Sequence, residues 1–161
     1  MLDIYTVAFF GHRYIDNPYK VEEQLEEYIL NLINEKEYVN FLVGRNGDFD
    51  RCVSSVVVRI RKKYRNDNSS LILMLPYPTA EYINNETYFE NYYSEIMISY
   101  AASRVRPKAA IQIRNREMVD SSDLIICYIE KNNGGAYETI KYASEHKKAV
   151  INLADNSHDK I

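Results

Sequence analysis

The chain has 161 residues, of which 46% are hydrophobic and 27% charged, a composition typical of one globular domain with a sizeable core. Its net charge of −3 and its pI near 5.7 argue against nucleic acid as a partner. The first residues lack the regions of a signal peptide, and no apolar run is long enough to span a membrane. We therefore expect a cytoplasmic protein without a membrane partner.

The first apolar run, Ile4 to Phe10, predicts a strand buried on both faces. It ends at Gly11-His12-Arg13, and a helix follows with Asp16 or Asn17 as its cap and Pro18 at its first position. In open α/β sheets ligands bind at the carboxyl ends of the strands. The glycine permits a close backbone approach and the arginine offers a planar fork of donors, so this loop indicates an anion site. The alternative is a structural loop whose arginine pairs with a carboxylate elsewhere.

Val39 to Val43 predicts a second strand, which runs into the loop Gly44-Arg45-Asn46-Gly47-Asp48. The helix after this loop ends in the basic residues Arg59, Arg61, Lys62, Lys63 and Arg65. Cations at this end complement the helix dipole, although a patch for polyanions is an alternative. Leu71 to Leu75 predicts a third strand.

A tyrosine-rich segment, residues 76–106, follows the third strand and predicts an excursion over the surface. The chain has 15 tyrosines and no tryptophan, and many of the tyrosines fall between Tyr77 and Tyr100. Long functional loops often act as lids. A packing layer or a dimer contact is the alternative, and the sequence does not separate the two.

Two further strands complete the pattern. Pro107 opens a helix that extends to about residue 118, and Leu124 to Ile129 predicts a fourth strand that leads to Asn132-Asn133-Gly134-Gly135. A helix over about 136–146 and a fifth strand at Ala149 to Leu153 follow. The tail, 154–161, is polar and expected to fray.

Five apolar runs alternating with helices predict a single Rossmann-like domain over 1–161, with three layers (α/β/α) and a mainly parallel five-stranded sheet. Right-handed crossovers favour the strand order 3-2-1-4-5. This order places the switch point between the first and fourth strands. We therefore predict that one pocket is lined by Gly11, Arg13, Gly44, Gly134 and Gly135.

Such a pocket suits an anionic, nucleotide-like ligand. Two helix amino termini, one after Arg13 and one after Gly135, would face it with unpaired N–H groups. Arg13, Arg45 and either Arg114 or Arg116 would add cations, and tyrosines of the long segment would stack on a base.

Other classes of site are not supported. Neither a G-x-x-x-x-G-K-[ST] nor a G-x-G-x-x-G motif is present, which argues against a P-loop NTPase and a dinucleotide dehydrogenase, and no cofactor is expected. His12, His146 and His158 are too scattered to indicate a metal site. Cys52 and Cys127 resemble small buried hydrophobic residues.

Four blocks of the chain, taken in order, resemble the SLOG superfamily, whose name joins the DNA-processing protein Smf/DprA to the LOG enzymes. Within it, the chain is most similar to small bacterial proteins with a Gly-His-Arg signature, relatives of the YpsA group. The resemblance spans nearly the whole chain. The blocks are Phe9-Phe10-Gly11-His12-Arg13, Gly44-Arg45-Asn46-Gly47-Asp48-Phe49-Asp50, Arg114-Asn115-Arg116-Glu117-Met118-Val119-Asp120 and Gly134-Gly135-Ala136-Tyr137.

The resemblance implies a Rossmann-like domain that binds nucleotides or nucleotide-derived signals, often as a homo-oligomer. The LOG branch hydrolyses the N-glycosidic bond of nucleoside monophosphates with a P-G-G-x-G-T-x-x-E element. This chain instead reads Asn133-Gly134-Gly135-Ala136-Tyr137-Glu138-Thr139, with no proline, no Gly-Thr pair and a glutamate closer to the glycines. The resemblance therefore supports phosphate binding by the glycines but does not carry the catalytic glutamate over to Glu138.

Two main hypotheses follow. The first is a sensor or sequestering module that binds a nucleotide-type ligand through Gly11, His12, Arg13, Gly44, Arg45, Asn46, Gly47, Arg114, Arg116, Gly134 and Gly135. The second is an enzyme that cleaves or transfers at an N-glycosidic bond, as LOG phosphoribohydrolases and nucleoside deoxyribosyltransferases do, with Glu138 or Asp48 as the carboxylate and His12 as an acid. A first-turn carboxylate that complements the helix dipole is the alternative role of Glu138. A third, less specific hypothesis is a structural partner protein whose tyrosine-rich segment makes contacts. We favour binding.

Overall fold

The structure is a computed structural model that describes residues 1–64 and 67–155. Arg65, His158 and the part of the predicted polar tail after residue 155 lie outside the described residues. The elements are β1 (Ile4–Gly11), α1 (Pro18–Glu35), β2 (Tyr38–Val43), α2 (Asp48–Tyr64), β3 (Ser69–Leu75), α3 (Ala80–Ile83), α4 (Glu86–Tyr92), β4 (Glu95–Ile98), η1 (Ala102–Arg104), α5 (Pro107–Asp120), β5 (Leu124–Tyr128), α6 (Gly135–Glu145) and β6 (Ala149–Asn152).

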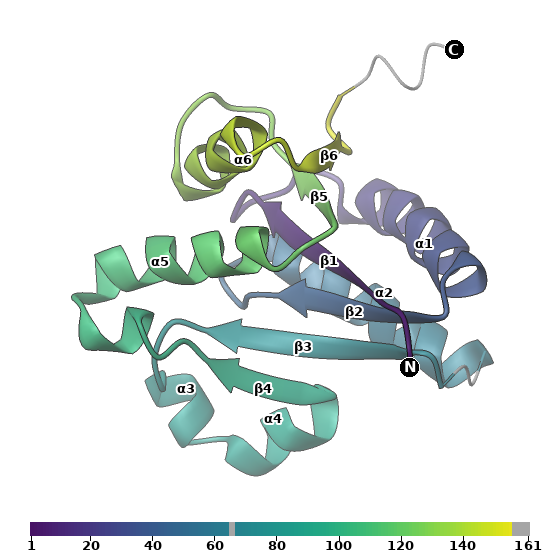
Figure 1. Ribbon diagram of the computed structural model, residues 1–161, viewed down its shortest axis with the longest axis horizontal. Helices are drawn as coiled ribbons and strands as arrows, with labels where there is room; N and C mark the ends of the chain where they lie inside the picture. Colours follow the sequence, from purple (N-terminus) through teal and green to yellow (C-terminus); the bar gives the residue numbers. More distant parts are fainter. Residues whose placement is uncertain (65–66, 156–161) are drawn as a thin grey trace.

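Within the described residues the sheet has six strands in the order β4-β3-β2-β1-β5-β6, and every neighbouring pair is parallel (Figure 1). The predicted Rossmann-like α/β class is confirmed. The prediction of five strands was wrong, because β4 adds a sixth strand beside β3, while the other five lie in the predicted relative order. The central strand β1 pairs with β2 on one side and with β5 on the other, which creates the switch point of the sheet.

Helices cover both faces of the sheet. Apolar residues at helical spacing, such as Leu25 and Ile29 of α1 and Val53 and Val57 of α2, are fully buried in the larger core on one face. The smaller core on the other face brings α5 and α6 onto Ala8, Phe10 and Leu42 among others. Successive side chains of a strand point to opposite faces, so the near-continuous apolar strands serve both cores.

The two cysteines are buried and free, as the sequence predicted. Burial raises the pKa of the Cys52 thiol to about 11 and that of Cys127 to about 12. Both thiols are therefore protonated near neutral pH and act as small apolar groups. In the described part of the chain, no helix is long and apolar enough to cross a membrane.

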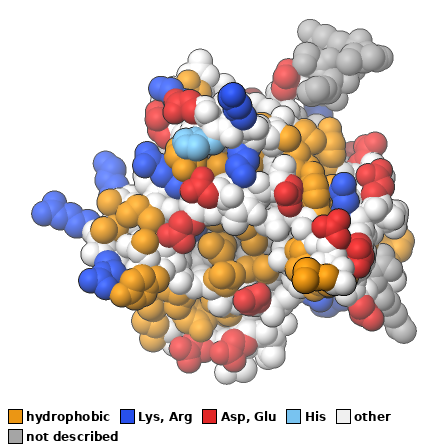
Figure 2. Space-filling view, in the orientation of Figure 1, with side chains coloured by type: hydrophobic (Ala, Val, Ile, Leu, Met, Phe, Trp, Pro, Cys, Tyr) orange, Lys and Arg blue, Asp and Glu red, His pale blue; other side chains and the backbone are white. Residues whose placement is uncertain are grey.

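The tyrosine-rich segment, residues 76–106, is more ordered than the sequence indicated. It forms α3, α4, β4 and η1, and Phe89 and Tyr93 belong to the larger core. Its edge strand β4 leaves Met97 and Ile98 exposed, and hydrophobic side chains gather in the lower half of the face shown in Figure 2, over β3, β4 and one end of α5. The segment therefore extends the sheet and closes one end of a core, in addition to covering surface.

Candidate functional site

A cavity of about 420 Å³ lies at the carboxyl ends of β1, β2 and β5. The prediction that Gly11, Arg13, Gly44, Gly134 and Gly135 line one pocket is confirmed, because all five line this cavity. They meet because β1 is flanked by β2 and β5, so that the loops after these three strands converge at one edge of the sheet. We call this space the switch-point cavity.

The switch-point cavity collects most of the other predicted binding residues but not all of them. His12, Asn46 and Arg114 also line it. Arg45 and Gly47 instead line a second cavity of about 370 Å³, which shares Gly44 and Asp50 with the first. The expectation that Arg45 adds a cation to this crevice was therefore wrong, and Gly47, predicted to bind ligand, lies at the neighbouring cavity.

Arg116 was also expected to add a cation to the crevice. It is exposed on α5 and does not line the switch-point cavity. Its guanidinium lies 5.2 Å from the ring centroid of Tyr142 on α6. This distance is typical of a cation–π contact, so Arg116 joins two helices at the surface.

Arg114 is a buried cation in the wall of the switch-point cavity, with 2% of its surface exposed. Its Nη1 donates to the carbonyl oxygen of Met74 at 2.7 Å, and its Nε donates to Oδ1 of Asn115 at 2.9 Å. Burial lowers the pKa of the Arg114 guanidinium, and the nearby Asp50 opposes this shift. Arginine stays charged in proteins, so the cavity has a positive group that water screens poorly.

A chain of hydrogen bonds connects Arg114 to the first turn of α6. The Asn115 amide that accepts from Arg114 donates from Nδ2 to Oγ1 of Thr139 at 3.0 Å. The Thr139 hydroxyl in turn donates to the carbonyl oxygen of Gly135 at 2.9 Å. Asn115 and Thr139 are both buried, so α5 holds the amino terminus of α6 in place beside the cavity.

Asp50 also lines the cavity and was not among the predicted site residues. Its Oδ2 accepts from the backbone N–H of Asn46 at 2.9 Å. A Cβ added to Gly44 would lie 3.1 Å from this oxygen and 3.2 Å from Nη1 of Arg114, so both side chains closely border Gly44. Burial raises the pKa of Asp50, against the lowering by the Asn46 N–H and by Arg114.

The glycines of the site have different roles. A Cβ on Gly11 would lie 2.3 Å from Cγ of Phe49, and one on Gly47 would lie 2.5 Å from Cα of Arg13. These two glycines therefore allow protein segments to pack closely, whereas the sequence suggested a close approach to a ligand. Gly134 has φ +96° and nothing within 4 Å of its added Cβ, and Gly135 has only Gln112 near, at 3.5 Å. The paired glycines leave the start of α6 open towards the cavity.

The three predicted catalytic residues are not brought together. Glu138 is exposed in the first turn of α6 and does not line the cavity. Oδ2 of Asp48 accepts from the backbone N–H of Ile15 at 3.0 Å, and Oδ1 lies 3.4 Å from Nη1 of Arg51. Asp48 therefore joins the loop after β1 to the first turn of α2. Of the three, His12 alone reaches the cavity, and its Nε2 accepts two hydrogen bonds.

The helix termini at the site differ from those expected. α6 begins at the cavity, with Gly135 and Ala136 in its wall. The start of α1, at Pro18, lies instead at a smaller cavity beside Cys52. At the switch-point cavity, the position expected for the start of α1 is occupied by the loop that leads into α2, through Gly44 and Asn46.

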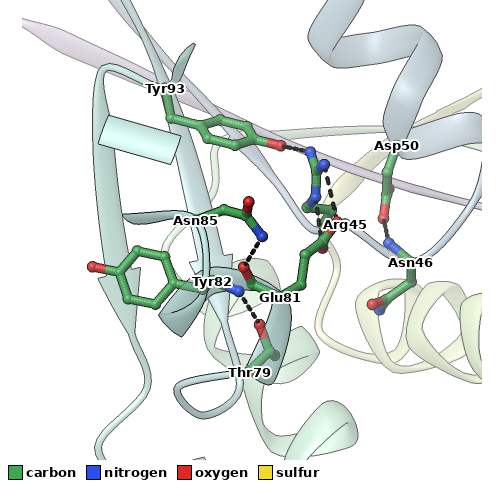
Figure 3. Close-up of polar contacts among 8 residues, drawn as sticks. All are labelled: Arg45, Asn46, Asp50, Thr79, Glu81, Tyr82, Asn85 and Tyr93. Carbon is green, nitrogen blue, oxygen red and sulfur yellow. Dashed lines mark hydrogen bonds and ion pairs between the residues drawn. The ribbon is translucent and has the colours of Figure 1, made fainter. Parts of the chain in front are cut away.

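Arg45 joins the tyrosine-rich segment to the loop after β2 (Figure 3). Its Nε lies 2.8 Å from Oε1 of Glu81, its Nη1 donates to the Tyr93 hydroxyl at 2.9 Å, and its guanidinium lies 4.7 Å from the ring centroid of Phe89. Burial acts against the charge, but the bonds to Glu81 and Tyr93 outweigh it and raise the pKa of Arg45. The carbonyl oxygen of Glu81 accepts from Asn85, which steadies α3.

The tyrosines expected to stack on a base lie at the second cavity. Tyr88, Tyr92 and Tyr93 line it, and the rings of Tyr88 and Tyr92 stack with centroids 5.8 Å apart. None of them lines the switch-point cavity, where the lining tyrosine is Tyr14. We call the second space the tyrosine cavity.

Comparison with known proteins supports the fold. Neither a protein-family model nor a curated protein sequence matches the chain. The solved structure of DNA processing protein A (DprA) from Streptococcus pneumoniae is similar, with a TM-score of 0.66 and 18% identity over 91% of this chain and 49% of that one. DprA from Helicobacter pylori is also similar, with a TM-score of 0.63 and 18% identity over 91% of this chain and 63% of that one.

The chain therefore has the Rossmann-like α/β fold that these DprA structures contain. These two DprA proteins are among the proteins that it resembles, and the chain spans about half of one and under two thirds of the other. The Helicobacter pylori protein binds single-stranded DNA. The expectation that excluded nucleic acid as a partner was wrong, because a protein of the same fold binds it and a net charge of −3 says little about a local site.

Proposed function

We propose that the switch-point cavity binds an anionic nucleotide or nucleotide-derived small molecule, and that the protein acts as a sensor or sequestering module. The observation that carries this proposal is the buried guanidinium of Arg114 in a cavity whose rim is the open Gly134–Gly135 start of α6. The amino terminus of a helix attracts anions through its unpaired N–H groups and its dipole. The exposed side chains of Arg13 and Lys131 add two flexible cations at the same cavity.

We also propose that the whole chain forms one domain. The four sequence blocks and the fold support a single SLOG domain of the Gly-His-Arg group, related to the YpsA proteins, over 1–161. Three of these blocks contribute residues to the switch-point cavity through Gly11, Gly44 and Gly134, and the fourth contributes Arg114. A homo-oligomer is part of the same proposal and rests on the resemblance alone.

Calorimetric titration with a panel of nucleoside mono- and diphosphates tests this function. A charge-assisted contact contributes about 1.5–3 kcal/mol, so Arg13→Ala should weaken binding by roughly ten- to a hundredfold. The matched control is Arg116→Ala, which removes an exposed arginine outside the cavity and should leave affinity unchanged. Equal affinities of the wild type and Arg13→Ala would show that Arg13 is structural. Native mass spectrometry of protein purified gently from cells would weigh a retained ligand directly.

A short single-stranded nucleic acid is a second candidate ligand. It is supported by the tyrosine cavity, which shares Gly44 and Asp50 with the switch-point cavity, and by the likeness to a protein that binds single-stranded DNA. One nucleotide would occupy the switch-point cavity and the next would stack on the tyrosines. Stacking on an aromatic side chain contributes about 1–3 kcal/mol per base.

The exposed Tyr88 distinguishes the two candidates. If a strand binds, Tyr88→Ala should weaken the binding of a trinucleotide by about five- to a hundredfold while leaving the affinity for a mononucleotide unchanged. Tyr19→Ala, which also removes an exposed tyrosine, is the control because Tyr19 lines neither cavity. A trinucleotide that binds no more tightly than a mononucleotide would rule out the second candidate.

A further inference from the structure

His12 contacts the loop between β5 and α6 through one ring nitrogen. Its Nε2 accepts from the backbone N–H of Glu130 at 2.8 Å and from that of Lys131 at 3.2 Å. Both donors are main-chain groups more than a hundred residues away in the sequence. The ring therefore joins the loop that ends β1 to the loop that leads into α6.

These two bonds define the protonation state of His12. A nitrogen that accepts from two N–H groups cannot carry a proton of its own, so the ring is neutral and its proton is on Nδ1. Protonation of Nε2 would place an N–H group against two N–H groups. Both hydrogen bonds would then be lost.

The segment that His12 holds is short and is fixed at both ends. At its start, the side chain of Asn152 donates to the carbonyl oxygen of Ile129 at 2.9 Å and accepts from its N–H at 3.0 Å. At its end, the N–H of Glu138 donates to the carbonyl oxygen of Gly134 at 3.1 Å. Between these two points, His12 accepts from the N–H groups of Glu130 and Lys131, which line the cavity together with Gly134 and Gly135.

We propose that His12 is a positioning residue, whose neutral ring holds residues 130 and 131 so that Gly134 and Gly135 present their N–H groups to an anion, and whose protonation releases this loop. The proposal rests on the proposed function, because it assumes that the start of α6 binds an anion. It differs from the role first expected of His12, which was direct contact with the ligand or donation of a proton.

The groups around the ring determine the direction in which the pKa of His12 is shifted. Burial lowers the pKa of His12, the carboxylate of Glu130 opposes this shift, and the ammonium group of Lys131 adds to it. The ring of Tyr128 meets His12 edge-on with centroids 6.5 Å apart, and Asp16 acts electrostatically on Tyr128. The neutral ring therefore stabilises the loop fully at pH values above the ordinary histidine pKa of about 6.5. This stabilisation is lost as the pH falls through the lower pKa that His12 has in the folded protein.

Two roles of His12 predict opposite effects of pH. A histidine that contacts the anion directly binds it more tightly once protonated, because a charge-assisted bond is stronger. A histidine that only holds the loop weakens anion binding on protonation. The pH dependence of binding therefore distinguishes a contact from a positioning role.

The experiment uses the whole chain and inorganic sulfate, whose charge does not change where histidine titrates. Nitrogen chemical shifts of His12 should show the Nδ1–H tautomer at neutral pH. The protection factors of the Glu130 and Lys131 amides, which correct for the intrinsic pH dependence of hydrogen exchange, should fall as the ring becomes protonated, and sulfate affinity should fall with them. An Nε2–H tautomer, or a sulfate affinity that rises on protonation, would overturn the proposal.

Two variants complete the test. His12→Gln retains an acceptor that does not titrate, so loop protection and sulfate affinity should become independent of pH in this range. His12→Ala removes the acceptor, and exchange at the two amides should quicken by about five- to a hundredfold at neutral pH. If His12→Ala exchanges like the wild type, the loop does not depend on His12. The tautomer and exchange measurements need no anion, so they remain decisive if sulfate and nucleotides do not bind.

Discussion

Gly11 packs directly against Phe49, so closely that a Cβ on Gly11 would lie 2.3 Å from Cγ of the ring. Phe49 is fully buried and cannot move aside without disturbing the larger core. Overpacking of this kind typically costs about 1–3 kcal/mol. We therefore expect Gly11→Ala to lower the free energy of unfolding by this amount in urea denaturation. A variant as stable as the wild type would show that the end of β1 adapts.

Gly135→Ala is expected to behave in the opposite way. Its added Cβ would lie 3.5 Å from Nε2 of Gln112, an ordinary contact, and alanine is favoured over glycine in a helix. The free energy of unfolding should change by less than about 1 kcal/mol. If the start of α6 binds anions, the methyl group should nevertheless weaken nucleotide binding in calorimetry. Lost stability with unchanged binding would assign Gly135 to packing.

The contacts of Arg45 predict unequal effects of two substitutions. The ion pair with Glu81 is partly exposed, so Glu81→Gln should cost less than about 1 kcal/mol. Arg45→Met also loses the bond to the Tyr93 hydroxyl and the contact with Phe89, and should cost about 1–3 kcal/mol. Urea denaturation measures both. Equal costs would show that the ion pair, rather than the aromatic contacts, holds the tyrosine-rich segment.

Asp50 predicts a pH dependence of stability. Its folded pKa is raised, so the folded protein binds more protons than the unfolded chain above pH 3.8, and stability is lost as the pH rises through the folded value. Asp50→Asn does not titrate but retains an oxygen for the Asn46 N–H. As the pH rises from about 4 to about 7, the free energy of unfolding of the wild type should therefore fall relative to that of Asp50→Asn. A shift in favour of the wild type would mean that Arg114 stabilises the carboxylate more than burial destabilises it.

We expect little or no hydrolysis of nucleoside monophosphates. Glu138 lies outside the cavity, and a misplacement of about 1 Å can cost roughly a hundredfold in rate. The measurement is chromatography for free base after incubation with a panel of nucleoside monophosphates and deoxynucleosides. Multiple turnovers that disappear in Glu138→Ala would favour the N-glycosidic enzyme instead.

The sequence was informative where apolar periodicity was strong. Continuous apolar runs such as Leu71 to Leu75 are fully buried strands, and their alternation with helices was enough to predict the α/β class and the convergence of three loops. β4 was missed because it has only four residues, Glu95–Ile98, and three of them are exposed. Such an edge strand forms by pairing with β3 and leaves no burial pattern in the sequence.

The site was predicted less completely than the fold, because burial of polar groups depends on the partners that they find. Arg45 was assigned to the crevice, but Glu81, from the segment that was hardest to interpret, draws it to the tyrosine cavity. Asp50 was overlooked although a carboxylate at the third position of a helix, as Asp50 is in α2, often accepts from an N–H group just before the helix, here that of Asn46. That position was the signal that could have identified it.

The central position of β1 has a consequence for how the molecule folds. The N–H of Thr6 on β1 donates to a carboxylate oxygen of Asp123, at the start of β5, and these residues are 117 positions apart. Contacts of long sequence separation carry a large loop-closure entropy and tend to form late. We expect the strands before β5 to assemble first around the larger core, and the switch-point cavity to be completed only when the last third of the chain docks. A partly folded intermediate would then be compact but would lack the wall of the cavity that Gly134 and Gly135 form.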